Sequence, residues 1–134
     1  MACATKPVMG VKSVEELQVY QKALSAADAV SAILKRPAVQ RDARLREQLG
    51  ASSAGVPALI AEGFAQSTDR HFAQYCYRSR GESSETRTHL RVATGRDYLS
   101  LEELTGLTDR YNEIERMQTG LIRHLEKENR RHRG

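Results

Sequence analysis

A chain of 134 residues is long enough to bury one hydrophobic core, and its periodic apolar positions with 28% charged residues exclude a disordered chain. Aromatic residues make up only 5% and Trp is absent, which favours closely packed helices over an aromatic-rich β-sandwich. The formal net charge of +4 is uneven, because residues 123–134 alone contribute +3 and give the chain a basic C-terminal end.

The cysteine content and the apolar stretches indicate a cytoplasmic protein. Cys3 and Cys76 are too few and too far apart for a disulfide framework or a CxxC metal motif, which favours a reducing compartment. Residues 1–12 lack a charged segment followed by an apolar run, so we expect no signal peptide. No apolar stretch approaches the roughly 20 residues of a membrane span, so we expect no membrane association.

The first predicted helix begins at Ser13, which has capping-box spacing with Glu16 and follows a flexible leader of residues 1–12. Its apolar or small positions recur in steps of three and four, as expected for a stripe that faces a partner helix. This stripe consists of Leu17, Tyr20, Leu24, Ala27, Ser31 and Leu34. Pro37 is expected to end the helix near Lys35, because a proline disfavours helical backbone at the residue before it.

The second predicted helix runs from about Arg41 to Ala65 and contains a proline. Its core stripe consists of Leu45, Leu49, Ser52, Val56, Leu59 and Gly63. Pro57 removes one hydrogen bond inside this helix at a cost of about 3 kcal/mol, so the surrounding architecture must offset that loss.

The third predicted helix is capped by Ser67 or Thr68, with Asp69 favourably placed in its first turn. Its core stripe consists of Phe72, Cys76, Ser79, Ser83, Thr86, Leu90 and Ala93. The middle of this stripe is small and hydroxylated, so little apolar area is available there, which favours further burial against another chain.

The fourth predicted helix follows a break near Asp97 and begins at Ser100, which has capping-box spacing with Glu103. Its apolar positions are Leu101, Leu104, Leu107, Tyr111, Ile114, Met117, Leu121, Ile122 and Leu125. This set is wider than one seam requires, so the helix either lies deep in the bundle or faces a second subunit. We expect it to fray after Glu128 into a basic tail of residues 129–134.

These elements predict an all-α fold, an antiparallel up-down four-helix bundle over residues 13–128, because short connections favour antiparallel neighbours. The wide fourth stripe and the thin third stripe also predict a homo-oligomer.

A motif in the second helix resembles a known family of four-helix bundles. Residues 55–63 read Gly-Val-Pro-Ala-Leu-Ile-Ala-Glu-Gly, which is similar to the run Ser-Ile-Pro-Ser-Asn-Ile-Ala-Glu-Gly of the proteins encoded in intervening sequences of 23S ribosomal RNA. A proline six residues before a glycine, here Pro57 and Gly63, is unusual inside an amphipathic helix. Gly55 and Leu59 depart from that run and replace its polar groups.

A second segment of the same resemblance lies in the third helix. Arg80 and Gly81 resemble the centre of the family's Ala-Arg-Gly-Ser, with Ser79 and Glu82 replacing the flanking residues. The motif residues are Pro57, Glu62, Gly63, Arg80, Gly81 and Glu85.

The resemblance covers roughly residues 14–125 and implies a four-helix bundle that assembles as a ring-like pentamer. Similar bundles are accessory proteins of diversity-generating retroelements, which bind nucleic acid and a reverse transcriptase through a basic oligomeric surface. For most of the family no biochemical function is established, and the resemblance carries over no catalytic residue.

The polar residues provide no set typical of an enzyme. Glu62, Arg80 and Glu85 form either a polar site between two helices or, as we favour, an interhelix or intersubunit ion pair that fixes register. They lack a nucleophile, a metal or a second acid. His71, His89, His124 and His132 show no ligand spacing, and a buried, inert thiol is expected at Cys76. We therefore expect no catalytic residue, metal or cofactor, and no enzymatic activity.

The arginines indicate a partner with phosphate groups. Arg80, Arg87 and Arg91 are spaced by seven and four residues and share one helix face. The candidate phosphate contacts are Arg80, Arg87, Arg91, Arg123, Lys127, Arg130, Arg131 and Arg133. The competing interpretation is that Glu82, Glu85 and neighbouring subunits neutralise them.

Three hypotheses follow. The first is an oligomeric module that binds RNA or DNA through phosphates; Tyr77 is the only tyrosine of the third helix expected to face outward, which argues against sequence-specific recognition of single strands. The second is a scaffold that holds a protein partner on the wide apolar stripe or in a ring. The third, an enzyme, is the least favoured.

Overall fold

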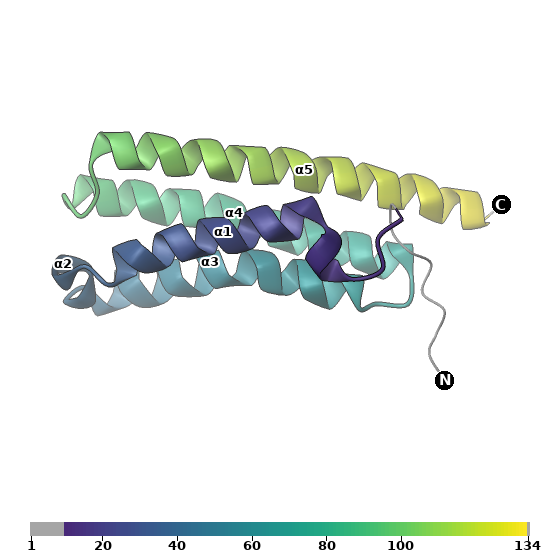
Figure 1. Cartoon of the computed structure of the whole chain (residues 1–134), viewed down its shortest axis with the longest axis horizontal. Coiled ribbons are helices and arrows are strands. Elements are labelled where there is room, and N and C mark those ends of the chain that lie inside the picture. Colours follow the sequence, from purple (N-terminus) through teal and green to yellow (C-terminus); the bar gives the residue numbers. More distant parts are fainter. Residues whose placement is uncertain (1–9, 134) are drawn as a thin grey trace.

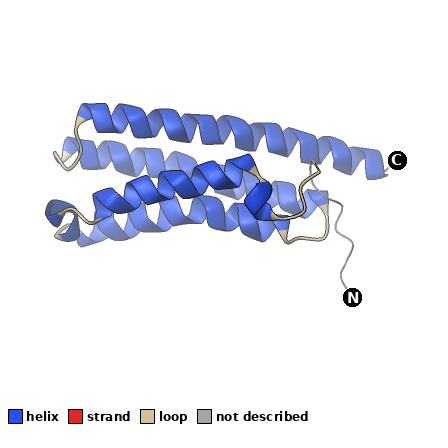
Figure 2. Cartoon of the chain, in the orientation of Figure 1, coloured by secondary structure: helices blue, strands red, loops and turns tan. Residues whose placement is uncertain are grey.

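The computed structural model describes residues 10–133, and within this range the regular elements are all helical (Figure 2). They are the 3-10 turn η1 (Val14–Glu16) and the helices α1 (Gln18–Leu34), α2 (Pro37–Gln40), α3 (Ala43–Phe64), α4 (Asp69–Gly95) and α5 (Leu101–Arg133). The leader predicted for residues 1–12 falls mostly on residues 1–9, outside the described part.

The four long helices form the predicted antiparallel up-down bundle. α3 packs against α1 and α4, α4 packs against α5, and α5 closes the bundle against α1 (Figure 1). The α3–α4 and α4–α5 pairs are the most extensive, whereas α1 lies less closely against α5. The short helix α2, which the sequence did not predict, lies in the connection between α1 and α3.

Most of the predicted helix boundaries are confirmed, but the first helix begins later than predicted, because Ser13 and Glu16 cap the turn η1 and α1 starts at Gln18. α1 ends at Leu34, ahead of the proline, and Thr68 caps α4 by accepting a hydrogen bond from the backbone N–H of His71 at 3.2 Å. Ser100 and Glu103 form a reciprocal capping box, with both hydrogen bonds at 3.0 Å. Asp97 turns the chain between α4 and α5 with a φ of 63°.

The predicted core stripe of the first helix was wrong by one position. The face of α1 that enters the core consists of Val19, Ala23, Ala26, Val30 and Ile33. Leu24, placed in the core by the sequence, is 41% exposed. The two stripes have the same spacing and differ by a rotation of about 100°, and the interior accommodates two alanines where the larger residues had been expected.

The predicted stripes of the second and third helices are buried throughout. The hydroxyl groups of α4 find partners within the chain: Ser79 donates to the Val56 carbonyl at 2.7 Å, and Thr86 donates to Ser52 at 2.9 Å. Ser83 donates to Glu115 of α5 at 2.9 Å. The thin centre of this stripe is therefore covered by α3 and α5, and another chain is not needed to bury it.

The last helix is longer than predicted and most of its wide stripe is internal. α5 continues to Arg133, so the helix does not fray after Glu128 as predicted, and most of the basic tail of residues 129–134 belongs to it. Leu107, Tyr111 and the apolar residues near its C-terminal end are buried within the chain, whereas Leu101 at its start is 73% exposed. Of the two alternatives for this stripe, the deep position in the bundle accounts for most of it.

No helix in residues 10–133 is both long enough and apolar enough to cross a membrane.

Candidate functional site

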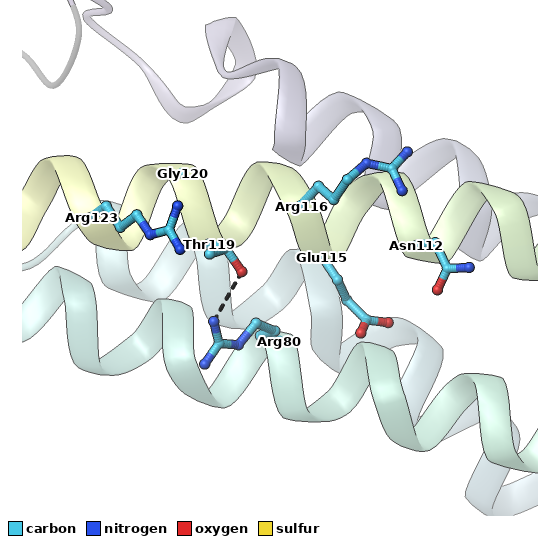
Figure 3. Close-up of a pocket in the computed structure, with 7 residues that line it drawn as sticks. All are labelled: Arg80, Asn112, Glu115, Arg116, Thr119, Gly120 and Arg123. Atoms are coloured by element: carbon cyan, nitrogen blue, oxygen red, sulfur yellow. Dashed lines mark hydrogen bonds between the residues drawn. The ribbon is translucent and has the colours of Figure 1, made fainter.

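A shallow groove with a volume of about 680 Å³ runs along the outside of the bundle between α4 and α5 (Figure 3). It is lined by Arg80, Asn112, Glu115, Arg116, Thr119, Gly120 and Arg123. Three of these seven residues are arginines, and Glu115 carries the only carboxylate among them. The groove is therefore a positively charged surface feature made largely by one face of α5.

Arg80 is the contribution of α4 to this groove. Its Nη1 donates to the hydroxyl of Thr119 at 3.0 Å (Figure 3). Its guanidinium also lies 5.1 Å from the centre of the Tyr77 ring. A cation over an aromatic face is stabilised by the ring quadrupole. These contacts hold Arg80 in the groove while leaving its charge without a carboxylate partner among the described residues.

Arg116 and Arg123 are exposed and lie two turns apart on α5, with Gly120 between them. Neither forms an ion pair with any residue in the described part of the chain. The sequence prediction included Arg123 but missed Arg116, although the seven-residue spacing between them was a signal that could have identified it.

The basic face continues beyond the groove toward the C-terminal end of α5. Lys127 and Arg130 are exposed and follow Arg123 at helical spacing. Arg131 is also exposed but lies 3.3 Å from the carboxylate of Glu128. Arg133 ends the helix, and its side chain lies outside the described part. We call Arg80, Arg116, Arg123, Lys127 and Arg130 the basic row.

Arg87 is in a different environment from the basic row. Its Nε and Nη2 donate to the two carboxylate oxygens of Glu115 at 2.6 and 2.9 Å. This hydrogen-bonded ion pair raises the pKa of Arg87. Arg87 therefore ties α4 to α5, and its charge is compensated before any ligand arrives. Arg91 is exposed on α4 and does not line the groove.

The opposite side of α4, which faces α3, is closely packed around the motif of residues 55–63. A Cβ atom at Gly63 would lie 2.7 Å from both Phe72 and the Cβ of Tyr75, so only glycine permits this approach of the two helices. Pro57 is buried, and α3 continues through it without a break. The Ser79 hydroxyl joins α4 to the Val56 carbonyl in the same turn.

The model of the family described as 23S rRNA-intervening sequence protein matches residues 15–120. The chain belongs to this family. A comparison with curated proteins gave no match.

Two departures from the 23S rRNA-intervening sequence motif lie against each other in space. The carboxylate of Glu82 would approach a Cβ atom at Gly55 to 3.2 Å. Serine stands at both positions in the sequence pattern that the chain resembles, so the smaller residue at 55 makes room for the larger one at 82. Burial, with the nearby charge of Glu85, raises the pKa of Glu82.

The other motif residues of the family are not gathered into one polar site. Glu62 is exposed on α3, and Glu85 lies 3.2 Å from His89 on its own helix. Arg80 reaches toward α5 instead. The predicted register-fixing ion pair among Glu62, Arg80 and Glu85 does not form within the described chain. The interhelix ion pair along α4 is made by Arg87, which sequence reasoning had assigned to phosphate.

The remaining candidates in residues 10–133 are the thiol of Cys76 and the groups that could bind a metal ion. Cys76 is fully buried, and desolvation raises the pKa of its thiol to about 12, as expected for an inert core cysteine. No group of three or more His, Cys, Asp or Glu side chains gathers in the described chain at a distance suited to a metal ion.

Proposed function

We propose that the chain is a cytoplasmic, non-enzymatic module that assembles into a homo-oligomer and associates with RNA or other nucleic acid. The observation that carries this proposal is the basic row, in which five exposed or half-buried cations lie along α5 and the α4–α5 groove without a carboxylate partner in the described chain. A phosphate backbone supplies the missing negative charge.

The composition of the row suits phosphate. Four of its five members are arginines, whose planar guanidinium groups donate paired hydrogen bonds to phosphate oxygens. Thr119 and Asn112 add neutral polar groups to the lining of the groove. Such contacts position a nucleic acid without reading its sequence.

Assembly would multiply the effect of the row. The family resemblance implies a ring-like pentamer, and each subunit of a ring presents the same basic surface. Several weak phosphate contacts held in one particle raise avidity without any new contact. Light scattering coupled to size exclusion tests this part, and a pentamer would have about five times the 15.0 kDa mass of the chain. A purely monomeric mass at micromolar concentration would remove the avidity argument.

Fluorescence anisotropy tests the binding itself. The ligands are a structured ribosomal RNA fragment, an unrelated RNA of equal length and a DNA duplex, each at low and physiological salt. The informative variant is R116Q/R123Q, and its matched control is R41Q/R44Q, which removes the same charge from exposed positions at the other end of the bundle.

We expect the wild-type chain to bind and R116Q/R123Q to bind more weakly, with a salt slope reduced by about 1.8 for the loss of two phosphate contacts. The control variant should retain most of the wild-type affinity. Absence of binding to every ligand at both salt concentrations would refute the proposal. Equal losses in the two variants would show that net charge acts and the row does not.

A protein-interaction scaffold is the alternative. Such a scaffold would hold its partner in the central hole of a ring or on the wide apolar stripe of α5, most of which is buried within the chain. It becomes the preferred function only if nucleic acid does not bind.

A further inference from the structure

The aromatic rings next to the basic row are already occupied. Tyr77 is 44% exposed, but its hydroxyl donates to Glu126 at 3.0 Å and Arg80 covers one face of its ring at 5.1 Å. Tyr75 is half-buried, and the guanidinium of Arg78 lies 5.2 Å from its ring centre. A guanidinium therefore already lies against each ring, which reduces the open aromatic surface on which the bases of a single strand could stack.

The row is also straight and rigid. Arg116, Arg123, Lys127 and Arg130 lie on one helix, and a rise of about 1.5 Å per residue spreads them over about 21 Å. Their outward direction follows from the opposite face of α5, where Ile114, Leu121 and Leu125 are buried. A fixed line of cations suits a stiff ligand with regularly spaced phosphates better than a flexible strand that must be ordered first.

We infer that the basic row takes the sugar-phosphate backbone of a double-stranded nucleic acid and reads no bases. This inference rests on the proposed function of the same surface and adds the class of ligand. A duplex keeps its bases paired inside and presents a higher density of phosphates, so it gains most from cations and loses nothing from the reduced aromatic surface.

The test compares the full chain on four labelled ligands of equal length at physiological salt: an RNA duplex, a DNA duplex of the same sequence, a DNA duplex of scrambled sequence and an unstructured oligouridine strand. Dissociation constants are measured by fluorescence anisotropy for the wild type, R116Q/R123Q and R41Q/R44Q.

We expect at least one kind of duplex to bind about tenfold more tightly than the single strand, with equal affinity for the two DNA sequences. The R116Q/R123Q variant should lose this advantage, and the R41Q/R44Q variant should keep it. A preference between the RNA and DNA duplexes would identify which backbone is favoured. Tighter or equal binding of oligouridine would overturn the duplex inference while leaving the proposed function intact. No binding to any of the four would overturn both.

Discussion

The two sides of α4 are built differently. Toward α3 the helices approach so closely that Gly63 has no room for a side chain, and buried hydroxyl groups join the two backbones. Toward α5 the surface opens into a groove edged by Arg80, Arg116 and Arg123. The family match covers the closed side and stops at residue 120, whereas most of the basic row lies beyond it. Pro57 and Gly63 of the family motif therefore serve packing, whereas Arg80 of the same motif lines the groove.

The largest effect is expected on the closed side. Gly63→Ala should lower the free energy of unfolding by about 2–3 kcal/mol, because its Cβ would lie 2.7 Å from Phe72 and from the Cβ of Tyr75, which cannot move without its helix. Urea denaturation followed by circular dichroism measures the change. Wild-type stability in this variant would mean that α3 and α4 are further apart in solution than in the structure.

On the open side, the ion pair between Arg87 and Glu115 should matter less than the glycine contact. Glu115→Gln is expected to cost about 1 kcal/mol, because the paired side chains are only 31% and 19% exposed and Arg87 loses its countercharge. Denaturation of the variant measures this loss. The freed guanidinium lies beside the groove, so the salt slope of nucleic acid binding should also steepen by about 0.9.

Glu113→Gln is the matched control, because Glu113 lies on α5 like Glu115 and also forms an ion pair, with Lys22 of α1 at 3.0 Å. Both of these side chains are nearly half exposed. This substitution should cost less than about 0.5 kcal/mol. Equal costs for the two variants would contradict the special role given to the Arg87 pair.

The sequence predicted the closed side better than the open side. The core stripes of the second and third helices were predicted correctly because each helix has only one set of apolar or small residues spaced by three and four positions. The family motif in the second helix supported the same assignment. The first helix offered two stripes of identical spacing, and only the space left by three other helices decided that Ala23 and Ala26 face inward. The sequence could not show where α5 ends, because its last residues are charged and are equally compatible with a continuing helix and with an irregular tail.

For the candidate site, residue type alone could not separate free arginines from paired ones. Arg87 and Arg91 look alike in sequence, yet only Arg87 meets Glu115, which lies 28 residues away along the chain. The carboxylate partner comes from α5, and its register against α4 is a tertiary property. Arg116 was missed because its neighbours in sequence, Glu113 and Glu115, suggest a compensated charge. In the structure these carboxylates pair with Lys22 and Arg87, which leaves Arg116 unpaired in the described chain.

The contacts of Glu103 at the N-terminal end of α5, far from the groove, make the stability of the fold depend on pH. Arg36 and the backbone N–H of Ser100 both donate to Glu103, which lowers the pKa of this carboxyl from 4.5 to about 2. A lowered pKa in the folded state stabilises the fold above about pH 4.5, and this contribution is lost as the pH falls toward 2.

Glu103→Gln should therefore cost about 1 kcal/mol at neutral pH, a modest value because Arg36 and Glu103 are each 38% exposed. Thermal unfolding between pH 7 and pH 2 should show the wild-type and variant curves converging at the acid end. Curves that stay parallel over this range would exclude Glu103 as the titrating group.

The smallest expected effect is a stabilisation, and it comes from a glycine-to-alanine substitution like the one at Gly63. Gly120→Ala should raise the free energy of unfolding by about 0.5–1 kcal/mol, because alanine is the better helix former and a Cβ atom at Gly120 would meet nothing within 4 Å. Gly106→Ala is the control, since Gly106 is equally open on the same helix. Two stabilised variants would show that the outer face of α5 is free. If only the Gly120 variant is destabilised, another surface covers the groove in solution, and that face belongs to an interface between subunits and not to a nucleic acid.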